Sequence, residues 1–315
     1  MAPSRITKKR RAYRGAARSR GGRITRRRTD EEALQVDDLP PYKYEQLTNP
    51  GQIRVLQLHM TKGDVIDLEL KPVQHSDGGY QALSYVWGSE DKPFRATVHN
   101  GTGAALGYIP LTLSLFNALR DLRDSEGVKS KQFWIDQICI DQQGDEKNHQ
   151  VAIMGEIYRN AAGVITYLGP TEDQGVEEST VELLDRIYDH FSPNFDMLLE
   201  IGDLSDAYDR RASFPVPALP SDLEEEVTAC AKGGWVLDDA ASKKWRHLTA
   251  WAYGDWTQRL WMVQEQLLNR NTQILGGRRL LRWDTIATTT FWFYLQFLPD
   301  SWLTHFWTQH EFDDE

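Results

Sequence analysis

Cysteine and long apolar runs are both scarce in this chain, and each scarcity excludes a class of protein. Two cysteines in 315 residues cannot form a disulfide framework, which favours a reducing compartment. The most apolar late stretch, residues 291–298, is far shorter than the roughly 18 residues of a membrane span. The N-terminus also lacks the apolar core of a secretory signal. We therefore expect no membrane span and a cytoplasmic or nuclear location.

Familiar catalytic signatures are also missing from the sequence. It contains no G-x-S-x-G elbow, no phosphate-binding P-loop and no H-E-x-x-H zinc motif. The stretch "GTGAALG" (101–107) is interpreted as a turn because it does not connect a strand to a helix. Cys139 and Cys230 lie far apart, so no zinc site or other metal site is expected.

Acidic residues are absent from residues 1–28, which carry twelve Lys and Arg. The rest of the chain therefore holds 24 of the 36 basic residues and all 46 acidic residues. The composition predicts a disordered basic arm over residues 1–40. This arm is a solvated tail, a nuclear-import or nucleic-acid contact, or a mitochondrial presequence. The acidic remainder makes nucleic-acid binding by any other part of the protein unexpected.

The first half of the chain alternates in the manner of β-hairpins. Residues 53–60 and 65–73 flank "TKGD", and residues 95–111 contain an Asn-Gly turn. The stretch "YQALSYVWG" (80–88) predicts a further strand that ends at Gly88. Apolar residues at helical spacing then predict a helix over 111–123, with Thr112 or Ser114 as its N-cap.

A strand-helix-strand unit follows, and it sets the fold class as α/β. "FWIDQICI" predicts a strand at 133–140, residues 144–161 predict a helix, and "GVITYLGP" predicts a second strand. Such a unit implies parallel strands, whose ligands bind beyond the carboxyl ends. Asp136 and Asp141 fall at that edge. They either mark a ligand site or satisfy local backbone N–H groups.

The second half of the chain is irregular and then rich in tryptophan. Residues 171–245 are interpreted as an insertion, and nine of the eleven tryptophans lie at 235–307, which is typical of a helical core with large side chains. A helix is predicted over 256–270 and a hairpin over 271–283. On that helix, Trp261 and Glu265 share one face, with Arg259 nearby. Glu265 is either a structural ion-pair partner or a carboxylate that faces a ligand.

Four stretches together resemble the heterokaryon incompatibility (HET) domain family of filamentous fungi. They are "YQALSYVWG", "FWIDQICIDQ", "EKNHQVAIMGEIYRNAAGVITYLG" and "RLWMVQE". The resemblance covers residues 41–290, with 171–245 as a variable insertion and 291–315 as a tail. One departure is Asp141, where the family usually has Asn.

The resemblance implies a role in nonself recognition and programmed cell death. It also implies a distant likeness to TIR domains, hence a flavodoxin-like parallel sheet core with flanking helices, an N-terminal hairpin and a helical insertion. Some TIR domains cleave NAD with a Glu in a Trp-x-x-x-Glu helix, a pattern that Trp261 and Glu265 reproduce. Two activities stay open: a NAD glycohydrolase, or a noncatalytic module that oligomerises and recruits death-pathway partners.

For the enzymatic alternative, Glu265 is the expected catalytic residue and NAD the substrate, with no bound cofactor. A carboxylate can stabilise the oxocarbenium character that develops when nicotinamide leaves the ribose. The expected substrate-binding residues are Tyr85, Trp87, Gly88, Asp136, Asp141, Arg259, Trp261 and Gln264.

Overall fold

The computed structural model describes residues 39–171, 173–194, 218–233, 240–252, 254–256, 259, 265, 267–286 and 288–289. By its internal contacts the chain divides between Asp38 and Leu39, and everything described here belongs to the second part. Residues 1–38 of the predicted basic arm and the whole predicted C-terminal tail lie outside the described residues. Among the helices that are described, none has both the length and the apolar character needed to cross a membrane.

A mixed nine-stranded sheet forms the centre of the fold, in the order β5-β4-β2-β1-β6-β3-β7-β8-β9. The strands are β1 (Gln52–Leu58), β2 (Ile66–Gln74), β3 (Gln81–Ser84), β4 (Phe94–His99), β5 (Ala105–Leu111), β6 (Gln132–Trp134), β7 (Gly163–Tyr167), β8 (Thr272–Gly276) and β9 (Arg279–Arg282). Strands β6, β3, β7 and β8 are mutually parallel. The α/β class is thus confirmed, but the sheet is not purely parallel, because β1, β5 and β9 run antiparallel to their neighbours.

The three predicted hairpins are all present. β1 pairs with β2 in a register that places Leu56 opposite Leu70. β4 pairs with β5, and the Asn100 side chain accepts hydrogen bonds from the backbone N–H groups of Thr102 and Ala104 in the turn between them. Such side-chain bonds stabilise the turn locally, which is why short sequence patterns predicted it correctly. The third hairpin, β8 with β9, turns at Gly277, whose φ of +51° favours glycine.

The helices are α2 (Leu113–Asp124), α3 (Asp136–Cys139), α4 (Glu146–Ala152), α5 (Met154–Asn160), α6 (Gln174–Phe191), α9 (Ser221–Gly233) and α10 (Ala240–Ala252), with 3-10 turns at η1 (His75–Asp77) and η2 (Ser192–Asn194). Thr112 is the N-cap of α2, where its hydroxyl accepts from the backbone N–H of Leu115. The predicted single helix over 144–161 is two helices, α4 and α5, that meet at Ile153.

The strand predicted over 133–140 is wrong beyond its first two residues. β6 ends at Trp134, and the next residues form α3, a single helical turn in which Cys139 N donates to Ile135 O at 2.7 Å. Ile138 and Cys139 are fully buried in this turn, as they would be in a strand. A short apolar run has no periodicity that separates a buried strand from a buried helical turn, so the pattern misled the prediction.

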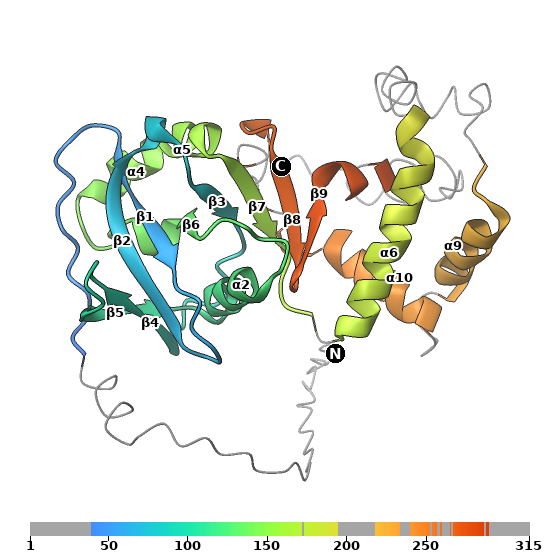
Figure 1. Ribbon diagram of the computed structural model, residues 1–315, viewed down its shortest axis with the longest axis horizontal. Helices are drawn as coiled ribbons and strands as arrows, with labels where there is room; N and C mark the ends of the chain where they lie inside the picture. The colour runs from blue at the N-terminus through green and yellow to red at the C-terminus, as the bar shows by residue number, and fades with distance from the viewer. Residues whose placement is uncertain are drawn as a thin grey trace, which may run out of the picture. The chain divides into compact units, whose positions relative to one another are not determined.

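Two apolar clusters hold the described part together. The larger one surrounds β1, β2, β3, β6 and β7 and includes Trp134, Tyr80 and Phe133, all at most 1% exposed. The smaller one joins Leu184 of α6, Trp251 of α10 and the strands β8 and β9. Figure 1 shows α6, α9 and α10 gathered beside these two strands. The described helices between β7 and β8 therefore form a layer at this edge of the sheet.

Candidate functional site

The order of the parallel strands places a topological switch between β3 and β7. From β3 the chain leaves toward β4 and β5 and returns through α2 to β6 on one side, whereas from β7 it leaves through α6 toward β8 on the other side. Neighbouring parallel strands whose connections leave in opposite directions open a crevice beyond their carboxyl ends, where α/β proteins bind ligands. Residues 84–88, which begin at the last pair of β3, lie at this point.

Glu265 lies against the end of β3, although 181 positions separate it from Ser84 in the sequence. The Ser84 hydroxyl donates to Glu265 Oε2, and it accepts from Trp256 Nε1 at 2.7 Å. Glu265 is 2% exposed and Ser84 is 1% exposed, so both groups are removed from water. The single hydroxyl proton of Ser84 is committed to Glu265, which fixes the direction of this hydrogen-bond chain.

Arg259 links the same carboxylate to the backbone just beyond β3. Its Nη1 donates to the Tyr85 carbonyl at 2.5 Å, and its Nη2 donates to Glu265 Oε1 at 3.2 Å. Both oxygens of Glu265 are therefore bound, one by a hydroxyl and one by a cation. A carboxylate held in this way is oriented before any ligand arrives.

Asp136 begins α3 just beyond β6 and faces the same site. Trp87 Nε1 donates to Asp136 Oδ2 at 2.8 Å, and the backbone N–H of Gln137 donates to Oδ1 at 2.7 Å. Burial raises the pKa of Asp136 to about 6, and the negative charge of Glu265 adds to this rise, while the two hydrogen bonds and Arg259 oppose it.

A cavity of about 320 Å³ opens between these groups, and we call it the Glu265 cavity. The described residues that line it are Trp87, Asp136, Ile140, Gln142, Lys147, Val151, Met154, Arg259 and Glu265. Two acids and two cations thus converge on a wall of apolar side chains. Lys147 makes no ion pair with any carboxylate of the described part of the chain, so its charge is available to a ligand. The volume lies at the lower end of the range for ligand pockets, about 300–1,000 Å³.

Four of the nine site residues expected from the sequence line this cavity: Trp87, Asp136, Arg259 and Glu265. Tyr85 lies behind it, 2% exposed, and burial together with the charge of Asp136 raises the pKa of its hydroxyl far above the usual value. Gly88, with a φ of +70°, lines a different cavity.

Asp141 is not among the described residues of the Glu265 cavity. Its carboxylate accepts from the backbone N–H of Gln143 at 3.0 Å, as in a local turn. Trp261 and Gln264 lie outside the described residues. Asp141 therefore fits the local backbone role that the sequence left open for it.

The sequence did not indicate Ser84, Lys147 or Trp256 as site residues. Ser84 carried the clearest overlooked signal, because a hydroxyl at the end of an otherwise apolar buried strand needs a partner. Lys147 and Trp256 carried no such signal, since a lysine on a short helix and one tryptophan among many are common features.

Comparisons with known proteins identify the family of this chain but do not address the geometry of the site. The family model described as "Heterokaryon incompatibility protein (HET)" matches residues 80–265, which begin next to β3 and end at Glu265. The chain is 29% identical over 276 residues to "Heterokaryon incompatibility protein 6, OR allele" of Neurospora crassa. The alignment covers 82% of this chain and 38% of that protein, so the chain spans well under half the length of this relative. No solved structure matches the chain.

Proposed function

This chain belongs to the heterokaryon incompatibility family, and we propose that it acts in fungal nonself recognition as a cell-death effector that hydrolyses NAD. The observation that carries the chemical part is the buried Glu265 carboxylate, held by Ser84 and Arg259 at the edge of a cavity beyond the carboxyl ends of β3 and β6.

Hydrolysis of NAD requires little acid–base catalysis from the protein. Nicotinamide leaves the ribose as a neutral group, so its departure requires no proton. The ribose carbon then develops oxocarbenium character, and an oriented carboxylate such as Glu265 stabilises that charge. Water adds to the cation and releases one proton to solvent, which completes the hydrolysis to nicotinamide and ADP-ribose.

The other lining groups suit the remaining parts of the substrate. The Trp87 indole is 38% exposed and offers a face on which a planar ring can stack. Asp136 can accept hydrogen bonds from ribose hydroxyls, and the Lys147 ammonium can neutralise a phosphate. The volume of about 320 Å³ suits one nucleotide half of NAD rather than the whole dinucleotide.

The test uses the full chain, incubated with NAD while nicotinamide release is followed by chromatography. We expect Glu265→Gln to fold with an unchanged circular dichroism spectrum and to release nicotinamide at least about 100-fold more slowly, the scale of losing one transition-state interaction. Glu156→Gln is the matched control, because Glu156 is an exposed carboxylate on α5, outside the lining of the cavity, and should leave the rate unchanged. Release that Glu265→Gln leaves intact would remove Glu265 from the catalytic role.

A noncatalytic module is the second candidate, and one observation favours it. Both oxygens of Glu265 already have partners within the protein, as in a purely structural ion pair. This alternative predicts that the folded wild-type chain releases no nicotinamide, and that killing of fungal cells on expression survives Glu265→Gln but is lost when self-association is blocked.

A further inference from the structure

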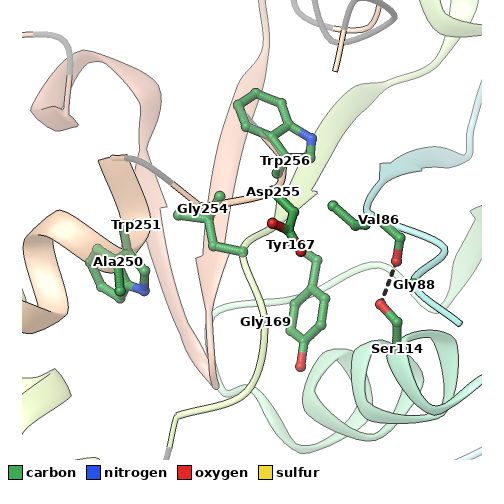
Figure 2. Close-up of a pocket in the computed structure, with 11 residues that line it drawn as sticks. Val86, Gly88, Ser114, Tyr167, Gly169, Ala250, Trp251, Gly254, Asp255 and Trp256 are labelled. Carbon is green, nitrogen blue, oxygen red and sulfur yellow. Dashed lines mark hydrogen bonds between the residues drawn. The ribbon is translucent and has the colours of Figure 1, made fainter. Parts of the chain in front are cut away.

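A second cavity of about 250 Å³ lies on the other side of residues 86–88 (Figure 2). Val86 and Gly88 line this cavity, whereas Trp87 between them lines the Glu265 cavity. The far wall comes from the end of β7 and from the turn that follows α10. We call it the Trp256 cavity, and it occupies the switch point between β3 and β7, where the crevice of such a sheet opens.

Three aromatic side chains dominate the walls of the Trp256 cavity. Tyr167, Trp251 and Trp256 are each at most 8% exposed, so their rings are held by packing. The Tyr167 hydroxyl donates to Asp121 at 2.6 Å, which fixes the far edge of its ring. Rigid aromatic surfaces of this kind stack well on planar bases, whatever the base.

The charges around the Trp256 cavity do not favour an anionic ligand. None of its described lining residues is Lys, Arg or His, and the one charged side chain is the exposed carboxylate of Asp255. A carboxylate repels phosphate but accepts hydrogen bonds from sugar hydroxyls. The volume is below that of pockets that enclose drug-sized ligands, which suits a single ring system.

Trp256 also connects this cavity to Glu265. Its indole N–H donates to Ser84, and the Ser84 hydroxyl donates to Glu265 on the other side of β3. A ring that stacks against Trp256 would therefore contact a side chain that two hydrogen bonds join to the proposed catalytic carboxylate.

We propose that the Trp256 cavity binds the neutral planar base of a nucleoside, with Asp255 accepting from the sugar. Its identification as the site for the adenosine half of NAD rests on the proposed function. The base site itself rests on the aromatic walls, the charge and the position at the switch point.

The test measures adenosine binding to the full chain by saturation-transfer NMR, so that no phosphate can bind elsewhere and imitate the result. Ala250 lines the cavity from an exposed position on α10, so Ala250→Phe should fill the cavity without disturbing the core. Ala250→Ser is the matched control that keeps the cavity open. We expect Ala250→Phe to weaken adenosine binding at least about tenfold, and Ala250→Ser to leave it unchanged.

The two possible failures can be told apart. If wild type does not bind adenosine, or if Ala250→Phe binds it as well as Ala250→Ser does, the base site is refuted, even where NAD hydrolysis is observed. If adenosine binding is lost in Ala250→Phe but no variant or wild type hydrolyses NAD, the base site stands and the proposed reaction falls.

Discussion

The Asp136→Asn variant should become more stable relative to the wild-type protein as the pH rises. In the folded chain the pKa of Asp136 is raised from 3.8 to about 6, chiefly by burial. Ionisation is therefore more costly in the folded state than in the unfolded one. The stability linked to this group is fully present below pH 3.8 and is lost as the pH rises through about 6. An asparagine cannot ionise and loses nothing over this range.

The size of the effect follows from the pKa shift. A rise from 3.8 to about 6 corresponds to at most about 3 kcal/mol of unfolding free energy, at 1.36 kcal/mol per pKa unit. The side chain keeps part of its surface in contact with solvent, so screening reduces this figure. Between pH 4 and pH 7 we expect the unfolding free energy of the variant to rise by about 1–2 kcal/mol relative to that of wild type.

The assay is urea unfolding of both proteins at pH 4, 5, 6 and 7, with the difference in unfolding free energy plotted against pH. Loss of a hydrogen bond to Trp87 changes the difference in unfolding free energy by the same amount at every pH, so it does not alter the slope of the plot, which we call the tilt. Since Glu265 raises the pKa of Asp136, the tilt should shrink when the comparison is repeated in a Glu265→Gln background. A flat curve, or a wild type that gains on the variant as the pH rises, would refute the assignment of Asp136 as a desolvated carboxylate.

Two further predictions concern buried partners. Ser84→Ala removes the hydroxyl between Trp256 and Glu265, so a buried indole N–H and a carboxylate oxygen each lose a hydrogen-bond partner. The free energy of unfolding in urea should fall by about 1–3 kcal/mol. Ser84→Cys of similar size should lose nearly as much, and a loss below the error of the measurement would contradict the hydrogen-bond chain. Arg54→Met breaks the ion pair with Glu146, in which the arginine side chain is only 4% exposed, and should cost about 3–5 kcal/mol. The double variant with Glu146→Leu should cost clearly less than the sum of the two single changes, and simple additivity would show that the pair is not coupled.

Local features of this protein were determined by the sequence alone. The hairpin at β1 and β2, the Asn100 turn and the Thr112 cap of α2 each depend on neighbours a few residues apart. The alternation of side chains and the capping oxygen carry that information directly in the sequence. The acids near the end of β6 were predicted on the same local grounds, although only Asp136 reaches the Glu265 cavity.

Only the tertiary structure decided the order of the strands and the composition of the two cavities. The sequence predicted parallel strands on either side of α4 and α5, but not that β3 lies between them. Ser84 meets Glu265 and Trp256 across more than 170 residues, and no short-range pattern encodes that contact. Such contacts arise because burial of apolar area fixes the sheet order, and polar groups trapped at its edge must then find partners wherever the chain brings them.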